Sequence, residues 1–250
     1  GPLPGQALVI LDPSLMLATE MIPCEDGHAQ ERSLTAEIVE LVAAKDVWIA
    51  DRNFCTRALL EGIVARDGFF VIRQHQNLPI RSSGTLRDSG QTDTGELREQ
   101  PVTVELGDGR SMKLRRVVLR LDAPTRDGDA EIAILTNLPT HTADGVKVAE
   151  LYRDRWTLET MFQSLTAMLA GELNTLGYPR AALLGFGVAL TAYNVLSTVQ
   201  ASLRPAFGSY KVLPEVSGFY IARSVCRNPR SRNGTMKRTA ARPVPAVHTA

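Results

Sequence analysis

The sequence predicts a mixed α/β protein in which an antiparallel β-rich insertion precedes two long helices. Short apolar runs alternate with amphipathic segments through residues 1–77, which is the pattern of an α/β core. Residues 78–138 alternate apolar and polar positions, are punctuated by Gly, Asp and Ser, and show no helical period. A helical apolar stripe returns in residues 139–204, whereas residues 205–250 are irregular and basic, so we expect the latter to be disordered.

The core elements follow one another as a β-hairpin, a helix, a strand, a helix and a strand. We expect these elements at Ala7–Leu11 with Leu15–Ile22, Ser33–Ala43, Val47–Ala50, Arg52–Arg66 and Phe69–Arg73. The turn of the hairpin is signalled by Asp12 and Pro13. Ser33 is a suitable N-cap for the first helix, whose Leu and Ile residues recur at helical spacing.

The insertion carries basic residues on its expected strands, 102–106, 112–121 and 131–135. Because side chains alternate between the two faces of a strand, basic residues alternating with apolar ones would form one cationic face. The residues concerned are Arg81, Arg87, Arg98, Arg110, Lys113, Arg115, Arg116 and Arg120.

Two helices are expected after the insertion. The first runs from Val146 to about Leu173 with an apolar stripe, and the second from Arg180 to Leu203. We expect both Trp48 and Trp156 to be core residues.

Composition places the chain among ordinary globular proteins. The 250 residues are 44% hydrophobic and 22% charged, which excludes wholesale disorder. Three widely spaced cysteines do not suggest a disulfide framework. No continuous apolar run reaches 18 residues and the first residues do not resemble a signal peptide, so we expect a cytoplasmic protein with no membrane partner.

The net charge of +1 conceals an asymmetry between the body and the C-terminal end. Seven of the 28 Lys and Arg residues and no acid lie after Ile221, which leaves the rest of the chain with an excess of six acidic groups. A basic tail on an acidic body suggests a polyanion partner such as nucleic acid, although such tails are often only solvated.

One residue and one helical stripe are candidates for a catalytic or ligand-binding role. Asp51 follows an apolar strand, where α/β folds place ligand-binding groups, but it would equally serve as a helix N-cap. Tyr152, Arg155, Glu159 and Thr166 share one narrow stripe of an ideal helix, where Tyr, Arg and Glu could approach a phosphate and a metal ion together. The alternative is a boundary stripe of solvated charges.

The segment around Glu159 resembles the signature helix of bacterial insertion-sequence transposases, the DDE enzymes of the IS4 type. Their pattern is Tyr, two residues, Arg, three residues, Glu, six residues, Lys; Tyr152, Arg155 and Glu159 match, whereas Thr166 stands in place of Lys. The stretches 48–54 and 68–73 are similar to the segment with the family's second catalytic Asp, here Asp51. Residues 3–6, 11–13 and 25–31 are similar to the early core, so the resemblance covers about residues 3–203.

The resemblance implies an RNase H-like core that is interrupted by a β-rich insertion before the last carboxylate. It also implies a site for two Mg²⁺ or Mn²⁺ ions, with Asp51 and Glu159 as catalytic metal ligands. Tyr152, Arg155 and Arg73 would then contact DNA. The partners implied are the double-stranded DNA of transposon ends and target, a second copy in a synaptic dimer, and the bacterial nucleoid.

The front of the chain departs from that pattern. An RNase H-like core begins with three antiparallel strands and carries its first catalytic Asp on the first of them, but this sequence shows only two strands before the first helix. We therefore expect the first strand and its Asp to lie upstream of Gly1, and the chain to be impaired in catalysis. Asp12 could substitute for it, although its turn position favours a structural role.

Two other functions remain open at this point. One is a metal-dependent nuclease of the same fold. The other is a non-catalytic DNA-binding remnant, which would bind with a steep salt dependence and no response to divalent metal.

Overall fold

A computed structural model describes residues 5–106, 109–125, 128–168 and 178–207. The side chains of residues 164, 166–168, 204, 206 and 207 are outside this description. The chain divides into two compact units, Gly1–Ser197 and Thr198–Ala250, and the first contains all the strands, helices α1 to α4 and the candidate site. As expected, it is a mixed α/β structure.

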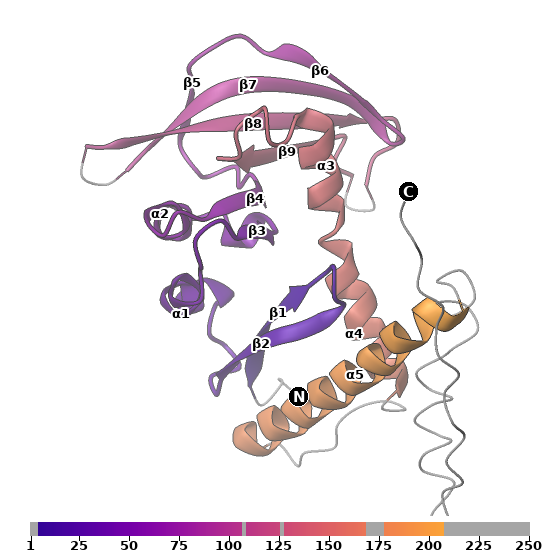
Figure 1. Cartoon of the computed structure of the whole chain (residues 1–250). Helices are drawn as coiled ribbons and strands as arrows, with labels where there is room; N and C mark the ends of the chain where they lie inside the picture. The colour runs from indigo at the N-terminus through magenta and orange to yellow at the C-terminus, as the bar shows by residue number, and fades with distance from the viewer. Residues whose placement is uncertain (1–4, 107–108, 126–127, 169–177, 208–250) are drawn as a thin grey trace, which may run out of the picture. The chain divides into compact units, whose positions relative to one another are not determined.

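The elements alternate at first and then become β-rich before the helices return (Figure 1). The N-terminal elements are β1 (Gln6–Asp12), β2 (Leu17–Cys24), η1 (Glu31–Leu34), α1 (Thr35–Glu40), β3 (Val47–Ala50), η2 (Arg52–Phe54), α2 (Arg57–Ala65) and β4 (Phe69–Arg73). These are followed by β5 (Ile80–Ser82), β6 (Arg87–Thr92), β7 (Gly95–Glu105), β8 (Ser111–Leu121), β9 (Glu131–Thr136), α3 (Gly145–Arg153), α4 (Trp156–Met168) and α5 (Pro179–Phe207).

One seven-stranded sheet joins the core strands to the insertion. Its order is β3-β4-β9-β8-β7-β5, with β6 paired to β7. The β3–β4 pair is parallel, as a connection through helix α2 requires, and the remaining pairs are antiparallel. Because β9 pairs with β4, the last strand of the insertion lies directly beside the last strand of the core.

The two faces of this sheet are covered by different helices (Figure 1). On β4, Phe70 and Ile72 are fully buried towards α1 and α2, whereas Val71 is fully buried towards α3. This alternation is the period of two expected of a strand buried on both faces. Ile134 on β9 and Val148 on α3 complete the second core.

The hairpin of β1 and β2 forms a separate two-stranded sheet. Its turn is fixed by Asp12, whose Oδ1 accepts hydrogen bonds from the backbone of Ser14 and Leu15 and from the Ser14 hydroxyl. The pKa of Asp12 is accordingly lowered, chiefly by the Ser14 hydroxyl. The structural role expected for Asp12 is confirmed.

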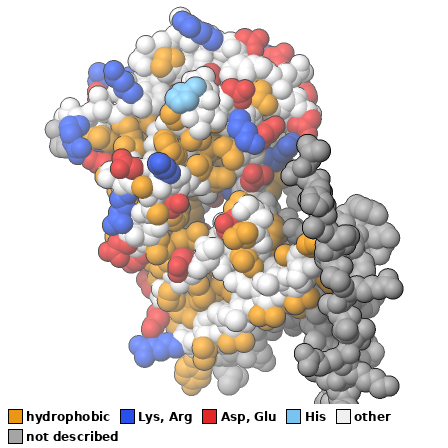
Figure 2. Space-filling model, viewed as in Figure 1, with side chains coloured by type: hydrophobic (Ala, Val, Ile, Leu, Met, Phe, Trp, Pro, Cys, Tyr) orange, Lys and Arg blue, Asp and Glu red, His pale blue; other side chains and the backbone are white. Residues whose placement is uncertain are grey.

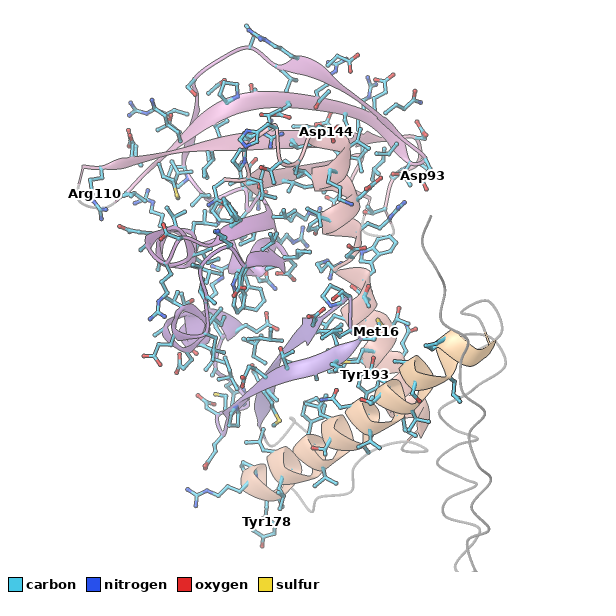
Figure 3. All side chains as sticks on the ribbon, in the orientation of Figure 1. Met16, Asp93, Arg110, Asp144, Tyr178 and Tyr193 are labelled. Carbon is cyan, nitrogen blue, oxygen red and sulfur yellow. The ribbon has the colours of Figure 1, made fainter. Side chains whose placement is uncertain are left out.

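A third, smaller core packs the hairpin against α4 and α5. It contains Val9, Met161, Leu165, Ala189, Leu190 and Tyr193. Tyr193 points from α5 towards the hairpin (Figure 3). The side-chain amide of Asn194 both accepts from the Ala18 amide at 2.9 Å and donates to the Ala18 carbonyl at 2.8 Å, so α5 is tied to the strand β2 by a pair of hydrogen bonds.

Several helix boundaries differ from the sequence-based expectation. Ser33 lies inside the turn η1 and donates its hydroxyl to the Gln30 carbonyl, so it does not cap α1. Helix α2 begins after Thr56, whose hydroxyl accepts from the Leu59 amide, whereas Asp51 caps only the short turn η2. The chain therefore forms a short turn and then starts a separate helix, instead of forming one helix from Arg52.

The insertion contains more strand than expected. Strands β5 and β6 were not among the expected strands, and β7 begins at Gly95, well before Val102. Gly95 has φ +153, and a Cβ there would lie 1.9 Å from the Arg120 carbonyl oxygen. Close approach of the neighbouring strand therefore requires glycine at this position.

Helix α5 also extends further than expected, from Pro179 through Pro205 to Phe207. A window within Pro179–Leu203 has a mean hydropathy of 1.6 over 18 residues, enough by length and composition to cross a membrane. The expectation that no segment reaches this threshold was wrong. Of that window 28% is buried, and Ala189, Leu190 and Tyr193 of α5 pack in the third core. The predicted tail, apart from its first residues in α5, lies outside the described residues.

Candidate active site

Asp51 and Arg73 leave the sheet at the same edge. Strands β3 and β4 are parallel and their pairing ends at Ala50 and Ile72, so the next residue of each strand lies at the carboxyl end of the pair. Asp51 turns the chain into η2, and its Oδ1 accepts the Asn53 amide at 2.7 Å. Asp51 is thus both the cap of η2 and a residue at the edge of the sheet, and the cap uses one of its carboxylate oxygens.

Tyr152 lies at the end of α3, against the same edge. Its side chain is in the core between α3 and the sheet, and the residue is 8% exposed. Burial raises the pKa of the Tyr152 phenol, the charges of Arg155 and Arg73 lower it, and the charge of Asp51 raises it. The hydroxyl therefore stays protonated at neutral pH, and these three charged residues surround it.

The helix expected from Val146 to Leu173 is broken between Tyr152 and Glu159. Helix α3 ends at Arg153 and α4 begins at Trp156, with tighter i→i+3 hydrogen bonds from the Arg155 amide to the Tyr152 carbonyl and from the Leu158 amide to the Arg155 carbonyl. The physical reason is packing, because α3 serves the core under the large sheet and α4 the core under the hairpin.

Arg155 nevertheless joins the two segments. Its guanidinium carbon lies 5.9 Å from the centre of the Tyr152 ring, within the range of a cation–π contact. Its Nη1 pairs with Glu159 Oε1 at 2.9 Å, with side-chain exposures of 24% and 58%. Within the described part of the chain, its buried Nε has no hydrogen-bond partner, so the guanidinium keeps an unused donor.

Arg73 is engaged by an acid that the sequence did not suggest. Its Nη2 pairs with Asp129 Oδ2 at 2.6 Å, and the side-chain exposures are 18% and 32%. The pKa of Asp129 is lowered first by the hydrogen bond from Arg73 and then by its charge, with a smaller contribution from the charge of Arg52. The site thus gathers Asp51, Tyr152, Arg155, Glu159 and Arg73 from four elements, with Asp129 at its margin.

A known protein family matches most of the chain. Residues 7–195 match the family described as Transposase DDE domain. The chain belongs to this family. The match includes all five clustered residues.

Two curated relatives agree with this assignment. One, from Geobacillus stearothermophilus, is named as a transposase for the insertion sequence element IS5377 and is 29% identical over 152 residues, which cover 55% of this chain and 38% of that protein. The other, from Sinorhizobium fredii, is named as transposase y4zB and is 29% identical over 116 residues, 46% of this chain and 32% of that protein. The matched stretches thus span about a third of each relative. A bacterial insertion-sequence transposase is confirmed, and the IS4 type stays a prediction.

The acidic residues of this transposase domain suit a divalent ion in kind. Asp51 and Glu159 offer hard oxygen ligands of the type that Mg²⁺ and Mn²⁺ prefer. In the described ranges no group of three His, Cys, Asp or Glu side chains is close enough to hold a metal ion. Asp12 is engaged in its turn, and the side chain of Thr166 lies outside the described residues.

The basic residues of the insertion do not form one cationic face. The strand register places Arg116 opposite Gln100 and Leu135, and Arg115 on the other face opposite Pro101 and Thr136. Several of these residues are paired with acids: Arg81 with Glu105, Arg110 with Glu61, and Arg115 with Glu99. On the face shown in Figure 2, positive and negative side chains are interspersed over this part of the transposase domain.

Arg115 instead fixes the approach of α3. It makes a two-pronged pair with Glu99, at 2.6 and 2.9 Å, and donates to the carbonyls of Leu138 and Ala143 at 2.8 and 2.7 Å. Asp144 then caps α3 by accepting the Lys147 amide (Figure 3). The pattern of alternating charge could not reveal this role, because the partners come from separate strands and a loop.

Trp156 was expected in the core, and this was wrong, because it is 58% exposed. It lies at the first position of α4, directly after Arg155, where the chain redirects from one core to another. Trp48 is half-buried and packs against the α1–α2 side of the sheet, as expected.

Proposed function

We propose that this chain is the catalytic part of an IS4-type DNA transposase that nicks transposon ends and joins them to target DNA. The observation that carries the proposal is the convergence of Asp51, Tyr152 and Arg155 at one edge of the sheet, with Glu159 held by Arg155. The same residues match the family pattern in the sequence, and the contacts of Arg155 with Tyr152 and Glu159 support the proposal although the helix between them is broken.

Asp51 and Glu159 would be the metal ligands. DDE transposases use divalent metal ions, and when two are bound they activate the attacking oxygen and stabilise the leaving oxygen of phosphoryl transfer. Asp51 keeps one carboxylate oxygen outside its cap. Glu159 is more than half exposed, so its carboxylate can exchange Arg155 for a ligand in the site.

Tyr152, Arg155 and Arg73 would hold the DNA backbone beside those carboxylates. The protonated Tyr152 hydroxyl can donate to a phosphate oxygen, and guanidinium groups match phosphate oxygens in pairs. Burial of the Arg155 stem and its contact with the Tyr152 ring orient its guanidinium before DNA arrives, which reduces the entropy lost on binding.

The third carboxylate would lie on a further strand that adds to the β-rich core. Among the described residues β1 pairs with β2 and β3 pairs with β4, so each has an edge that could accept another strand. In this proposal residues 1–77 and 139–204 form the RNase H-like core, residues 78–138 the insertion, and the basic residues 205–250 a DNA-attracting tail. The present chain is then impaired in catalysis.

The partners follow from this function. Double-stranded transposon ends and target DNA would be substrates, a second copy would complete a synaptic dimer, and the protein would act in the cytoplasm on the bacterial nucleoid. A second candidate is a DNA-binding remnant without catalysis. It is favoured by the absence, among the described residues, of any group of three His, Cys, Asp or Glu side chains that could hold a metal ion.

The test combines DNA nicking with metal binding. We expect the chain to bind supercoiled plasmid in a salt-dependent way and to nick it weakly or not at all with Mn²⁺. We also expect electron paramagnetic resonance to detect Mn²⁺ binding that Glu159→Gln weakens. Glu150→Gln is the matched control, because Glu150 is an exposed acid of α3 paired with Lys147.

The outcomes separate the candidates. Mn²⁺ binding that depends on Glu159 but not on Glu150 supports the catalytic assignment, and nicking with the same dependence would show that the chain already has its full set of ligands. DNA binding with no Glu159-dependent Mn²⁺ binding supports the remnant. Absence of DNA binding contradicts both.

A further inference from the structure

The guanidinium of Arg73 already holds an anion. Its Nη2 lies 2.6 Å from Asp129 Oδ2, and Arg73 is the more buried partner, with 18% of its side chain exposed against 32% for Asp129. The positive partner is therefore anchored at the end of β4, whereas the negative partner approaches it from the surface.

Asp129 lies in a turn whose described residues, Thr125, Gly128 and Asp129, are not buried. Its amide donates to the Thr125 hydroxyl at 3.1 Å, and its carbonyl accepts the Thr125 amide at 3.0 Å. Gly128, just before it, has φ +84, and a Cβ built there meets nothing within 4 Å. Movement of the Asp129 carboxylate would thus break one ion pair and disturb no buried apolar side chain.

The surroundings of Asp129 are positive. Arg52, the exposed residue directly after Asp51, acts on the Asp129 carboxylate by its charge, in addition to Arg73. The same Arg73 charge acts on the Tyr152 hydroxyl. One acid therefore lies among the cations that border the proposed catalytic edge.

We propose that Arg73 and Arg52 form a binding site for one DNA backbone phosphate, and that Asp129 occupies this site as a substitute anion until DNA displaces it. The inference rests on the proposed function. A carboxylate and a phosphodiester present oxygen pairs that a guanidinium recognises in the same manner. Asp129 keeps the Arg73 guanidinium oriented and excludes anions that bind weakly. A phosphate must compete with the Asp129 carboxylate for Arg73.

Competition between the Asp129 carboxylate and a phosphate predicts the direction in which the affinity for DNA should change. Removing the negative charge of Asp129 frees Arg73 without removing any donor, so the affinity for DNA should rise. Because the ion pair is partly exposed and therefore weak, we expect Asp129→Asn to tighten DNA binding only about three- to fivefold. A structural role for the pair, in which Asp129 merely fixes Arg73, predicts the opposite sign.

The experiment measures binding of a short fluorescein-labelled duplex by anisotropy over a series of NaCl concentrations, without divalent metal. Asp122→Asn is the matched control, because Asp122 is an exposed acid of the same β8–β9 connection and its substitution removes the same charge. Thermal unfolding of each variant shows that the fold is intact, and Asp129→Ala provides a second variant in case the amide of Asn hydrogen-bonds Arg73.

Arg73→Gln, Asp129→Asn and the double variant together form a double-mutant cycle. We expect Arg73→Gln to weaken binding and to reduce the slope of log K against log salt by about 1. In that background Asp129→Asn should change affinity no more than Asp122→Asn does. Equal effects of Asp129→Asn and Asp122→Asn in the parent chain, or weaker binding by Asp129→Asn, would overturn the inference and leave the proposed function standing. If Arg73→Gln leaves binding unchanged, the DNA-contact role of Arg73 fails as well.

Discussion

The large sheet and the N-terminal hairpin of this transposase domain are stabilised in different ways. Strands β4 and β9 of the sheet bury side chains on both faces, and Phe70, Ile72, Ile134 and Leu135 are fully inaccessible. On the hairpin strand β1, Val9 is the one residue classed as buried. A two-stranded sheet is marginal in water, so the hairpin depends on α4 and α5. The sheet that carries Arg73 is therefore stabilised by its own core, whereas the hairpin needs the two helices packed on it.

The largest effect should come from the core of the sheet. Phe70→Ala removes a fully buried ring between β4 and the α1–α2 layer and should lower the free energy of unfolding by about 3–5 kcal/mol. Urea denaturation followed by circular dichroism measures it. Leu15→Ala, at a position 57% exposed in the hairpin turn, should change stability by less than about 0.5 kcal/mol. A similar loss in both variants would contradict the contrast between the two regions.

The next effect concerns the polar link between the sheet and α3. Arg115→Met leaves Glu99 and two backbone carbonyls without their donor, which should reduce stability by about 3 kcal/mol. Arg81→Met is its control, because the Arg81–Glu105 pair is exposed at 77% and 51% and should contribute less than about 1 kcal/mol. Equal denaturation midpoints for the two variants would show that Arg115 does not link these elements.

A smaller effect sharpens the description of the hairpin. Asn194→Ala removes both side-chain hydrogen bonds to Ala18 and should destabilise the hairpin by about 1–3 kcal/mol. Hydrogen exchange should show faster exchange at the amides of β1 and β2 and unchanged protection at β8. Thr191→Ala serves as control, since the exposed Thr191 hydroxyl donates to the Gly187 carbonyl of its own helix. Uniform loss of protection over both sheets would mean that they unfold as one unit.

The smallest effect is a dependence on pH. The pKa of Asp129 lies below its ordinary value of 3.8, first because of the hydrogen bond from Arg73. A lowered folded-state pKa means that the stabilisation is complete above the unfolded value and is lost as the pH falls through the folded value. Carboxyl carbon NMR should therefore show Asp129 titrating below 3.8, and Arg73→Gln should move the midpoint upwards. A midpoint unaffected by that substitution would show that the pair does not persist in solution.

The sequence predicted most strands of the core, because these depend on local pattern, whereas the site residues that it suggested stay a prediction. Val47–Ala50 and Phe69–Arg73 were given by apolar runs of strand length, and their bounds are confirmed. The break at Asp154 and Arg155 was missed because the apolar stripe continues through it, and only the change from one core to another requires it. Strand β6 was missed because it is polar and is held by pairing with β7.

The contact of Asp129 with Arg73 could not be predicted at all. The two residues are 56 positions apart, and neither lies in a motif that points to the other. Long-range ion pairs follow from the register of strands β4, β8 and β9, which the pattern of each strand does not determine. The cationic face expected of the insertion failed for the same reason, since the partners of its arginines lie on other strands.

The pairing of β9 with β4 has a consequence for how this domain can vary. Residues Val71 to Arg73 on β4 pair with Ile134 to Thr136 on β9. Deletion of the whole insertion, β9 included, would therefore remove the strand that pairs with β4 on this side. Exchange of insertions between relatives should succeed when the recipient domain keeps its own β9 and only the part between β4 and β9 is replaced. Changes of length are best tolerated at turns such as residues 83–86, which lie at the surface after β5, a strand that β9, β8 and β7 separate from β4 in the sheet.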